Sequence, residues 1–285
     1  MISQAANQSE LSISNLQNQI IKELEVEKWD YNKTRLVKTK LQIRITQENN
    51  LIYTKLEGVI LRQELYQENS RNLEVLNNME QIAYLQWHGE YGKNQRKVGK
   101  WSATWDGEAL QNVGGYYKED LKEGLWKEPI KNYWSQAKVF ESGEYFHNQK
   151  KGRWNITEQD KTIVGGGSYN ELSQKIGKWI ELDEGFYDQL KVTWDGEYKQ
   201  DKKVGCWDIF YENIKIGGGT FGDGEGIKQG NWVELGNGFS YCSRVTENGE
   251  YHKGKKVGRW DMWYKDQDNK QNFQMQYNYN INCLC

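Results

Sequence analysis

Apolar and polar residues alternate over most of the chain from residue 87 onward, and many of the apolar positions are aromatic. In the stretch 207–211, residues 207, 209 and 211 share one face of an extended strand, because successive side chains of a strand point to opposite faces. Stretches of this kind are separated by polar turns such as Lys253-Gly254-Lys255-Lys256. The pattern predicts a series of β-hairpins.

Seven tryptophans stand in this series at gaps that alternate between 25 and 28 residues, so a unit of 53 residues recurs. They are Trp101, Trp126, Trp154, Trp179, Trp207, Trp232 and Trp260. Self-similarity at a fixed period indicates a repeat array, in which each unit contacts only its neighbours. We therefore expect a mainly β protein, with one elongated sheet of about seven antiparallel hairpins over residues 87–264.

A glycine lies two positions before each of these tryptophans. The set is Gly99, Gly124, Gly152, Gly177, Gly205, Gly230 and Gly258. A Cβ atom at this position would lift a neighbouring ring off the backbone, so we expect the glycine to let a ring lie flat there. The indole rings are then expected to lie one over the next along the sheet. Each hairpin opens either with Gly-Glu-Tyr, as at Gly196, or with a glycine pair or triplet, as at Gly217.

Residues 1–86 differ from the array and are predicted to form a cap over one of its ends. Apolar residues recur at steps of three and four between Leu11 and Trp29, which favours an amphipathic helix. Residues 35–66 alternate as a small β-meander, and Asn72–Ala83 is predicted to form a short helix. The alternative for the first helix is a short coiled-coil contact with a second copy, which would make a homodimer.

Residues 265–285 are predicted to close the other end. The glycine triplet expected near residue 270 is absent, whereas residues 273–279 alternate between apolar and polar and predict a last strand. The Cys283-Leu284-Cys285 ending has the form found in doubly prenylated small GTPases. Two unmodified thiols are the alternative.

Composition sets limits on the partners. The chain has 38 basic and 40 acidic residues, so its charge of −2 gives no general attraction to nucleic acid or to an anionic membrane. It lacks both a signal-peptide pattern and an apolar stretch of the roughly 18 residues that a transmembrane segment requires. We expect a cytoplasmic protein, with cytoskeletal or membrane association as a further option.

The motifs that could carry catalysis are weak, so no catalytic residue, metal site or cofactor is expected. Residues 217–222 match the dinucleotide fingerprint G-x-G-x-x-G, but a turn follows them where that motif requires a helix. The three histidines His88, His147 and His252 are too far apart in sequence for a ligand pair.

Carboxylates recur in two rows and lysines in one. The carboxylate rows are Glu90, Glu144, Glu197 and Glu250, and then Glu128, Glu181 and Glu234; the lysine row is Lys97, Lys151, Lys203 and Lys256. We expect ion pairs between strands, since equal environments do not separate the pKa values of two carboxylates as acid–base catalysis requires. The alternative role of the lysine row is to bind anionic phospholipid headgroups.

Large aromatic side chains are candidates for anchoring a protein partner. They are Trp105, Trp134, Trp194, Phe210 and Trp263. Trp and Tyr often dominate the energetics of protein interfaces. The alternative is that each of them packs within the sheet.

The combination of Tyr or Phe near a glycine, a lysine-rich turn and Gly-x-Trp, repeated about every two dozen residues, resembles the MORN repeat. The stretch from Gly196 to Trp207 is similar to the variant with the Gly-x-Trp ending, and the 53-residue rhythm resembles uncharacterised MORN-type proteins of ciliates. The resemblance covers about residues 87–264. It implies a non-enzymatic scaffold for unidentified protein partners in cytoskeletal, cortical or ciliary structures, and in some members phosphoinositide binding. A peripheral membrane adaptor is the alternative function.

Overall fold

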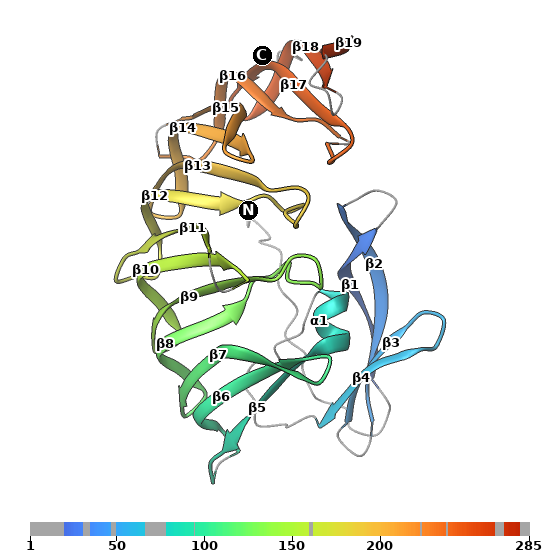
Figure 1. The fold of residues 1–285 in the computed structure, drawn as a ribbon, viewed down its shortest axis with the longest axis vertical. Coiled ribbons are helices and arrows are strands. Elements are labelled where there is room, and N and C mark those ends of the chain that lie inside the picture. The colour runs from blue at the N-terminus through green and yellow to red at the C-terminus, as the bar shows by residue number, and fades with distance from the viewer. Residues whose placement is uncertain are drawn as a thin grey trace, which may run out of the picture. The chain divides into compact units, whose positions relative to one another are not determined.

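The computed structural model describes residues 20–30, 35–46, 50–65, 78–93, 95–159, 162–222, 224–237, 239–265 and 271–279. The chain divides into two compact units. The smaller comprises Met1–Glu27 and Lys38–Ala83, and the larger comprises Lys28–Val37 and Tyr84–Cys285. Nearly every element of both units is a β-strand (Figure 1).

The smaller unit contains most of a four-stranded sheet in the order β1-β2-β3-β4, followed by the helix α1. Its elements are β1 (Ile20–Asp30), β2 (Arg35–Ile45), β3 (Asn50–Lys55), β4 (Ile60–Leu65) and α1 (Met79–Tyr84). The strands β2, β3 and β4 pair antiparallel over the residues for which the meander is predicted. Buried residues form its core: Val26, Leu41, Ile43, Leu51, Tyr53, Met79 and Ile82. The cap role stays a prediction.

The helix predicted for Leu11–Trp29 is wrong in its second half, because residues 20–30 form the strand β1; residues 11–19 lie outside the described part. Ile20 and Leu24 fit a helical step, but Val26 is buried while Glu23 and Glu25 are exposed, which is the period of a strand. The glutamates pair with lysines of β2 at 2.8 and 2.9 Å. The alternative prediction of a coiled coil is wrong for residues 20–29 for the same reason, because these residues form a strand. The helix predicted for Asn72–Ala83 is confirmed from Met79 onward, where α1 begins. Residues 72–77 lie outside the described part.

The larger unit contains a 15-stranded sheet in which every strand pairs with the next one in sequence. The strands β5 to β18 form seven consecutive hairpins, as the tryptophan rhythm predicts, and β19 is the predicted last strand (Figure 1). Their bounds are β5 (Leu85–Tyr91), β6 (Lys97–Trp105), β7 (Glu108–Lys118), β8 (Leu121–Pro129), β9 (Val139–Phe146), β10 (Gln149–Glu158), β11 (Thr162–Tyr169), β12 (Lys175–Leu182), β13 (Val192–Lys199), β14 (Lys202–Tyr211), β15 (Ile214–Phe221), β16 (Lys228–Leu235), β17 (Arg244–His252), β18 (Lys255–Lys265) and β19 (Gln271–Tyr279).

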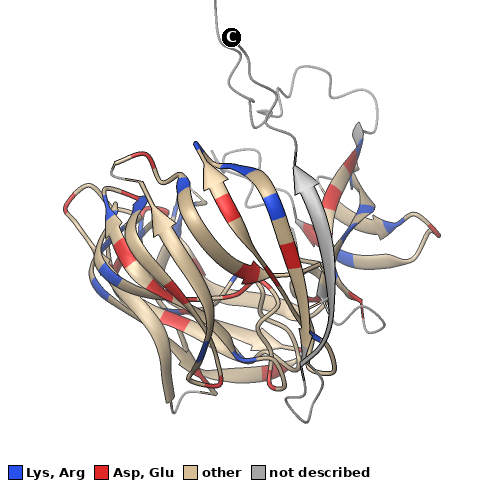
Figure 2. Cartoon of the chain, turned by 90° about the horizontal axis from the view of Figure 1, so that it is seen from above, with Lys and Arg blue, Asp and Glu red and all other residues tan. Residues whose placement is uncertain are grey.

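The strands of the large sheet curve, as Figure 2 shows by viewing them along the direction in which they follow one another. The register of the hairpin β13–β14 shifts between Asp195 and Glu197, and that of β17–β18 shifts between Asn248 and Glu250. Each shift lies at the glycine of Gly-Glu-Tyr and inserts extra residues in the partner strand at Gly-x-Trp. Such bulges bend a strand locally, so the two glycine motifs mark the bend of each hairpin.

The glycine two positions before each tryptophan does not lie under a ring, contrary to our expectation. Gly205 has a φ of +62°, and a Cβ atom built there meets nothing within 4 Å. The same holds for Gly99, Gly124, Gly152, Gly177, Gly230 and Gly258, whose φ values lie between +61° and +68°. These glycines are therefore required by the left-handed backbone of the bulge, where other L-residues are strained.

The ring lies instead on the glycine that opens the same hairpin. A Cβ atom at Gly196 would lie 2.2 Å from the Trp207 ring. Equivalent contacts of 2.0–2.6 Å occur at Gly89, Gly115, Gly143, Gly167, Gly219 and Gly249. Sequence spacing identified a glycine–tryptophan packing unit correctly but assigned it to the wrong one of the two glycines.

These two roles predict opposite responses to asparagine, which tolerates a positive φ better than alanine does. Gly205→Ala is expected to cost about 1–2 kcal/mol of stability, and Gly205→Asn less. At Gly196 both substitutions are expected to cost about 3 kcal/mol or more, because either Cβ displaces the Trp207 ring. Urea-unfolding midpoints of the four variants test this. An asparagine that relieves the cost at Gly196, or fails to relieve it at Gly205, would contradict the assignment.

Candidate functional site

The tryptophans form the centre of an aromatic ladder along one face of the large sheet, with every ring buried. They do not stack directly on one another as expected. A Tyr or Phe ring lies between each pair, so the order runs Trp101, Tyr117, Trp126, Tyr145, Trp154, Tyr169, Trp179, Tyr198, Trp207, Phe221, Trp232, Tyr251 and Trp260. Successive centroids are 4.9–6.2 Å apart and successive planes meet at 75–89°. Edge-to-face contact is the arrangement that aromatic quadrupoles favour.

Indole N–H groups hold the bulged strand in place. The Nε1 atom of Trp207 donates to the carbonyl oxygen of Glu197, and that of Trp179 donates to Ser168, each at 3.2 Å. The accepting residue is the middle one of Gly-x-Tyr, where the bulge interrupts the regular strand pairing. The indole N–H therefore adds a side-chain hydrogen bond between the two strands of the hairpin beside the bulge.

A lysine covers the other side of each tryptophan ring. The Nζ atom of Lys203 lies 3.9 Å from the centroid of Trp207, and that of Lys150 lies 4.1 Å from Trp154. The full row is Lys97, Lys122, Lys150, Lys175, Lys203, Lys228 and Lys256, at 3.9–5.0 Å from the respective rings. Each indole thus lies between a glycine backbone and an ammonium group, which is a cation–π geometry.

Carboxylates complete this layer by joining neighbouring lysines. Glu181 accepts from Lys175 at 2.5 Å, from Lys203 at 2.9 Å and from the Tyr198 hydroxyl at 2.8 Å. Glu234 does the same with Lys228 at 2.7 Å, Lys256 at 2.6 Å and Tyr251 at 3.0 Å. Glu128 pairs with Lys122 and accepts from Tyr145. The predicted ion pairs between this carboxylate row and Lys203 and Lys256 are confirmed.

One lysine and one whole carboxylate row of the predicted ion pairs lie elsewhere. Lys151 is one position out of register: its Nζ pairs with Glu171 at 2.6 Å and lies over the Phe146 ring at 4.8 Å, while Lys150 takes the ladder position. The row Glu90, Glu144, Glu197 and Glu250 lies exposed on the opposite face. Pairing of that row with the lysine ladder is therefore wrong.

The environment of the carboxylates shifts their pKa values in different directions. Burial alone would raise the pKa of Glu181 and of Glu234, but the two lysines around each carboxylate outweigh it and hold the pKa below its usual value. Burial raises the pKa of Glu141, against the attraction of Lys150 at 2.6 Å and together with repulsion from Glu128, its direct cross-strand neighbour. Burial and the neighbouring carboxylates also raise the pKa of the ladder tyrosines Tyr198 and Tyr251.

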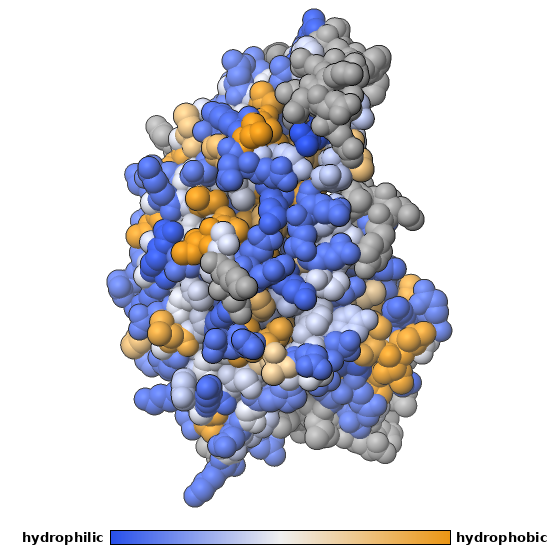
Figure 3. Space-filling model, in the orientation of Figure 1, coloured by the Kyte–Doolittle hydropathy of each residue, from blue (hydrophilic) through white to orange (hydrophobic). Residues whose placement is uncertain are grey.

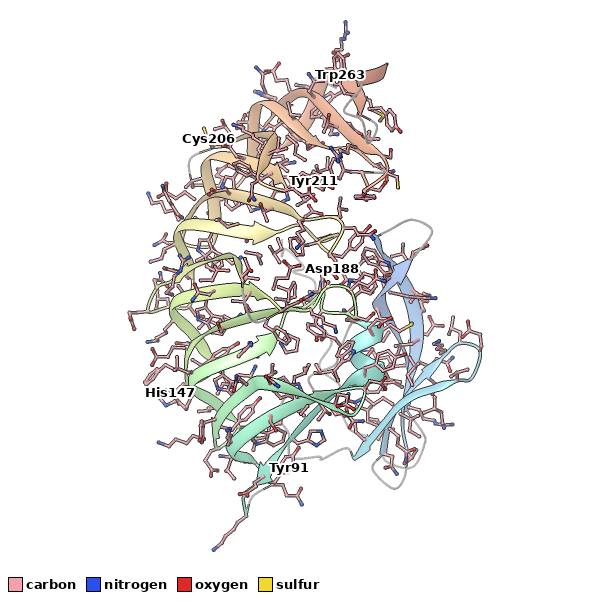
Figure 4. All side chains as sticks on the ribbon, viewed as in Figure 1. Tyr91, His147, Asp188, Cys206, Tyr211 and Trp263 are labelled. Atoms are coloured by element: carbon pink, nitrogen blue, oxygen red, sulfur yellow. The ribbon has the colours of Figure 1, made fainter. Side chains whose placement is uncertain are left out.

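None of the five aromatic residues proposed as partner anchors is among the exposed side chains. Trp134 is 2% exposed, and Trp105 packs edge-on against Tyr133 at 4.7 Å. The indole of Trp194 donates to Asp183 at 3.0 Å, and that of Trp263, marked in Figure 4, donates to Asn248 at 2.8 Å. Phe210 is half-buried. Contacts inside the larger unit account for Trp105, Trp194, Trp263 and Trp134, the last of which lies in the loop between β8 and β9 and stacks on Trp29 at 4.3 Å.

Sequence reasoning missed an apolar patch on the outer face, which we define as Tyr116, Leu125 and Phe146. They lie on the consecutive strands β7, β8 and β9 and are 57%, 80% and 49% exposed. Leu125 stands directly opposite Glu144. The equivalent residues of Leu125 in later hairpins are Lys178 and Asn231, so a comparison of outward positions across the repeats would have revealed the patch.

Polar residues lie between and around the side chains of this patch. Glu123 stands opposite Tyr116, and His147, seen at a hairpin end in Figure 4, lies 3.3 Å from the Glu123 carboxylate. Figure 3 shows that most of the visible face is polar, with several separate apolar groups. Because Lys178 and Asn231 occupy the position of Leu125 in later hairpins, the apolar patch is a local departure from the repeat.

The glycine triplet at residues 217–219 belongs to strand β15, as the repeat interpretation predicts, and does not open a helix. Each glycine has its own steric reason. A Cβ at Gly217 would meet the Val233 carbonyl oxygen at 2.5 Å, and one at Gly218 the Trp207 carbonyl oxygen at 2.3 Å. Within the described residues, no group of His, Cys, Asp and Glu side chains could hold a metal ion.

No known protein family matches the chain, and no curated protein does. Among solved structures, the chain is similar to BamB from Moraxella catarrhalis, with 9% sequence identity and a TM-score of 0.19. The alignment covers 84% of this chain and 61% of that protein's length. A similarity at this level carries no argument about fold or function. Among the residues with described structure, no helix has the length and apolar character needed to cross a bilayer.

The opposite pKa shifts predict different pH profiles for two glutamine variants. The pKa of Glu181 is lowered by folding, so its contribution is present above the unfolded pKa and is lost as pH falls through the folded value. Glu181→Gln is expected to cost about 1–3 kcal/mol at pH 7 and much less near pH 3.

Glu141 is the matched control. Its pKa is raised, so its contribution is present at low pH and is lost as pH rises through the folded value. Glu141→Gln should therefore cost less than Glu181→Gln at pH 7. Urea-unfolding midpoints between about pH 3 and pH 7 measure both effects. A pH-independent cost for Glu181→Gln, or a larger cost for Glu141→Gln at pH 7, would contradict the assignment.

Proposed function

We propose that this chain is a MORN-type, non-enzymatic scaffold that binds protein partners through the outer face of its hairpin array. The apolar patch of Tyr116, Leu125 and Phe146 carries this proposal. No packing role explains why Leu125 is 80% exposed where Lys178 and Asn231 occupy the same register. Exposed apolar side chains grouped on neighbouring strands and rimmed by polar residues are typical of protein-binding surfaces.

The ladder face supports the same conclusion from the other side. Its ionisable groups are engaged with one another: Glu181 joins Lys175, Lys203 and Tyr198 in one network. Acid–base catalysis requires polar groups that converge on a substrate. Here they converge on each other and on buried rings, which is a structural use. The resemblance to MORN proteins favours a cytoplasmic location at a cytoskeletal, cortical or ciliary structure.

Leu125→Lys tests the patch without disturbing the sheet. It recreates opposite Glu144 the pair that Lys178 makes opposite Glu197, so stability should change by no more than about 0.5 kcal/mol. Proximity labelling in the native cell should then show strong loss of partners relative to wild type. The control Asn231→Lys places the same charge opposite Glu250 in another hairpin and should leave labelling unchanged. Unchanged labelling in both variants, or equal loss in both, would overturn the proposal.

The alternative role in lipid binding finds less support in the lysine row. Lys203 and Lys256 are 26% and 21% exposed and are ion-paired with Glu181 and Glu234. Binding a headgroup would require breaking those pairs. We expect no flotation with liposomes that contain phosphoinositide at low salt, and salt-sensitive flotation that is lost in Lys203→Gln would restore the membrane-adaptor function.

A further inference from the structure

The outward-facing residues next to the aromatic ladder form a row across the large sheet. The ladder begins at Tyr91, whose ring packs edge-on against Trp101 at 5.2 Å. The residue just before each ladder ring points to the outer face, because successive side chains of a strand alternate between its two faces. On the first six strands these residues are all exposed, and we call them the outer row. In the order β5 to β10, they are Glu90, Lys100, Tyr116, Leu125, Glu144 and Arg153.

The outer row combines two members of the apolar patch with four charged residues. Lys100 stands directly opposite Tyr116 on the next strand, and Leu125 stands directly opposite Glu144. The charged members take no part in the ion pairs of the ladder, which lie on the opposite face of the sheet. The row therefore presents its charges and its two apolar side chains together at the outer surface.

The order of residues in the outer row is complementary to its own reverse. From β5 to β10 the row reads acidic, basic, apolar, apolar, acidic and basic. When a second copy of the row faces the first in reverse order, opposite charges meet at both ends and apolar side chains meet in the middle. Three kinds of pair then form, each of them twice: Glu90 with Arg153, Lys100 with Glu144, and Tyr116 with Leu125.

The reversal corresponds to a two-fold axis between two facing sheets. The axis is parallel to the strands and lies level with the boundary between β7 and β8, so β5 of one copy faces β10 of the other. A two-fold axis along the row would instead place each residue against itself, and Glu90 would meet a second Glu90. Like charges in contact are unfavourable, so the complementarity selects the first axis.

No later part of the sheet repeats this complementarity. On β11 to β18 the corresponding residues are Ser168, Lys178, Glu197, Cys206, Thr220, Asn231, Glu250 and Arg259. In every other run of six consecutive strands from β5 to β18, the same reversal yields at most a single pair of opposite charges and no pair of apolar side chains. The pattern is therefore specific to the strands that carry the apolar patch.

We propose that the outer row is a homodimer interface, in which two copies of this chain pack face to face about that two-fold axis. The same surface of each copy then forms the contact, as in most symmetric dimers. Tyr116 and Leu125 supply the apolar centre, and the charges on either side fix the orientation and exclude other registers. The inference rests on the proposed protein-binding role of the outer face and names a second copy of this chain as the partner.

Lys100 and Glu144 are the most informative pair for a test, because they are well separated within one chain. They lie on β6 and β9, which are three strand spacings apart in the sheet. At about 4.8 Å between strands, this distance is about 14 Å, which exceeds the screening length of about 10 Å in 0.1 M salt. An effect of one charge on the other at this salt concentration therefore reports a contact between two chains.

Charge-swap variants of the full-length protein test this pair by sedimentation equilibrium. We expect the wild-type protein to dimerise below about 100 μM. Lys100→Glu and Glu144→Lys should each weaken the dimer at least about tenfold, because like charges then meet twice in every dimer. The double variant has opposite charges at both contacts again, so its dissociation constant should return to within about threefold of the wild-type value.

A mixture of the two single variants distinguishes a lost contact from a misfolded chain. In a mixed dimer, each swapped residue meets a residue of opposite charge in the other chain. The mixture should therefore form dimers at a concentration at which each variant alone is monomeric. The control Lys178→Glu makes the same charge change on β12, outside the six strands of the interface, and should leave dimerisation unchanged.

Three results would overturn the homodimer: a monomeric wild-type protein at about 100 μM, no recovery of association in the double variant and the mixture, or equal weakening by the control. The outer face as a protein-binding surface is tested separately by the labelling experiment with Leu125→Lys. A monomeric wild-type protein together with loss of labelled partners in Leu125→Lys would reject this inference and leave the proposed function intact, with a different protein as the partner.

Discussion

The packing of one indole ring over one glycine, at the point where the hairpin bends, is the constraint on which the rest of the structure depends. Gly196 leaves room for the Trp207 ring, and Lys203 covers its other side at 3.9 Å. This stacked layer of backbone, ring and ammonium forms one part of the core of the larger unit. Clusters around Trp134 and Tyr133 form the other part. The Tyr or Phe ring between two successive tryptophans contacts both of them, so the aromatic packing continues from one hairpin to the next.

The two faces of the large sheet differ in how strongly their side chains are constrained. The ladder face is fixed, because its rings, lysines and glutamates contact one another in every repeat. The outer face has no such network. Glu90, Glu144, Glu197 and Glu250 recur on it, but other positions vary, as Leu125, Lys178 and Asn231 show at one register. Specific recognition can therefore reside on the outer face, with no change to the core that holds the array together.

The repeat period and the hairpins could be predicted from the sequence, because each follows from local spacing and turn residues. The roles of the glycines could not. Gly196 and Gly205 look alike in sequence, but one lies under a ring and the other adopts a positive φ, and only the bulge distinguishes them. Lys150 and Lys151 are likewise adjacent lysines on opposite faces. The strand β1 was mistaken for a helix because four-residue spacing and strand alternation coincide at Leu24. The outer patch could not be predicted from the tryptophans, because they are buried in the sheet, whereas Leu125 is exposed.

A double-mutant cycle at Gly143 and Trp154 tests the central packing unit most directly. A Cβ atom at Gly143 would lie 2.4 Å from the Trp154 ring, so Gly143→Ala in the wild-type background should be strongly destabilising. With Trp154→Leu in place the clash is removed, and the two effects should fail to add by about 1–3 kcal/mol in urea unfolding. Additive effects, within about 0.5 kcal/mol, would show that ring and glycine do not act as a unit and would contradict the account.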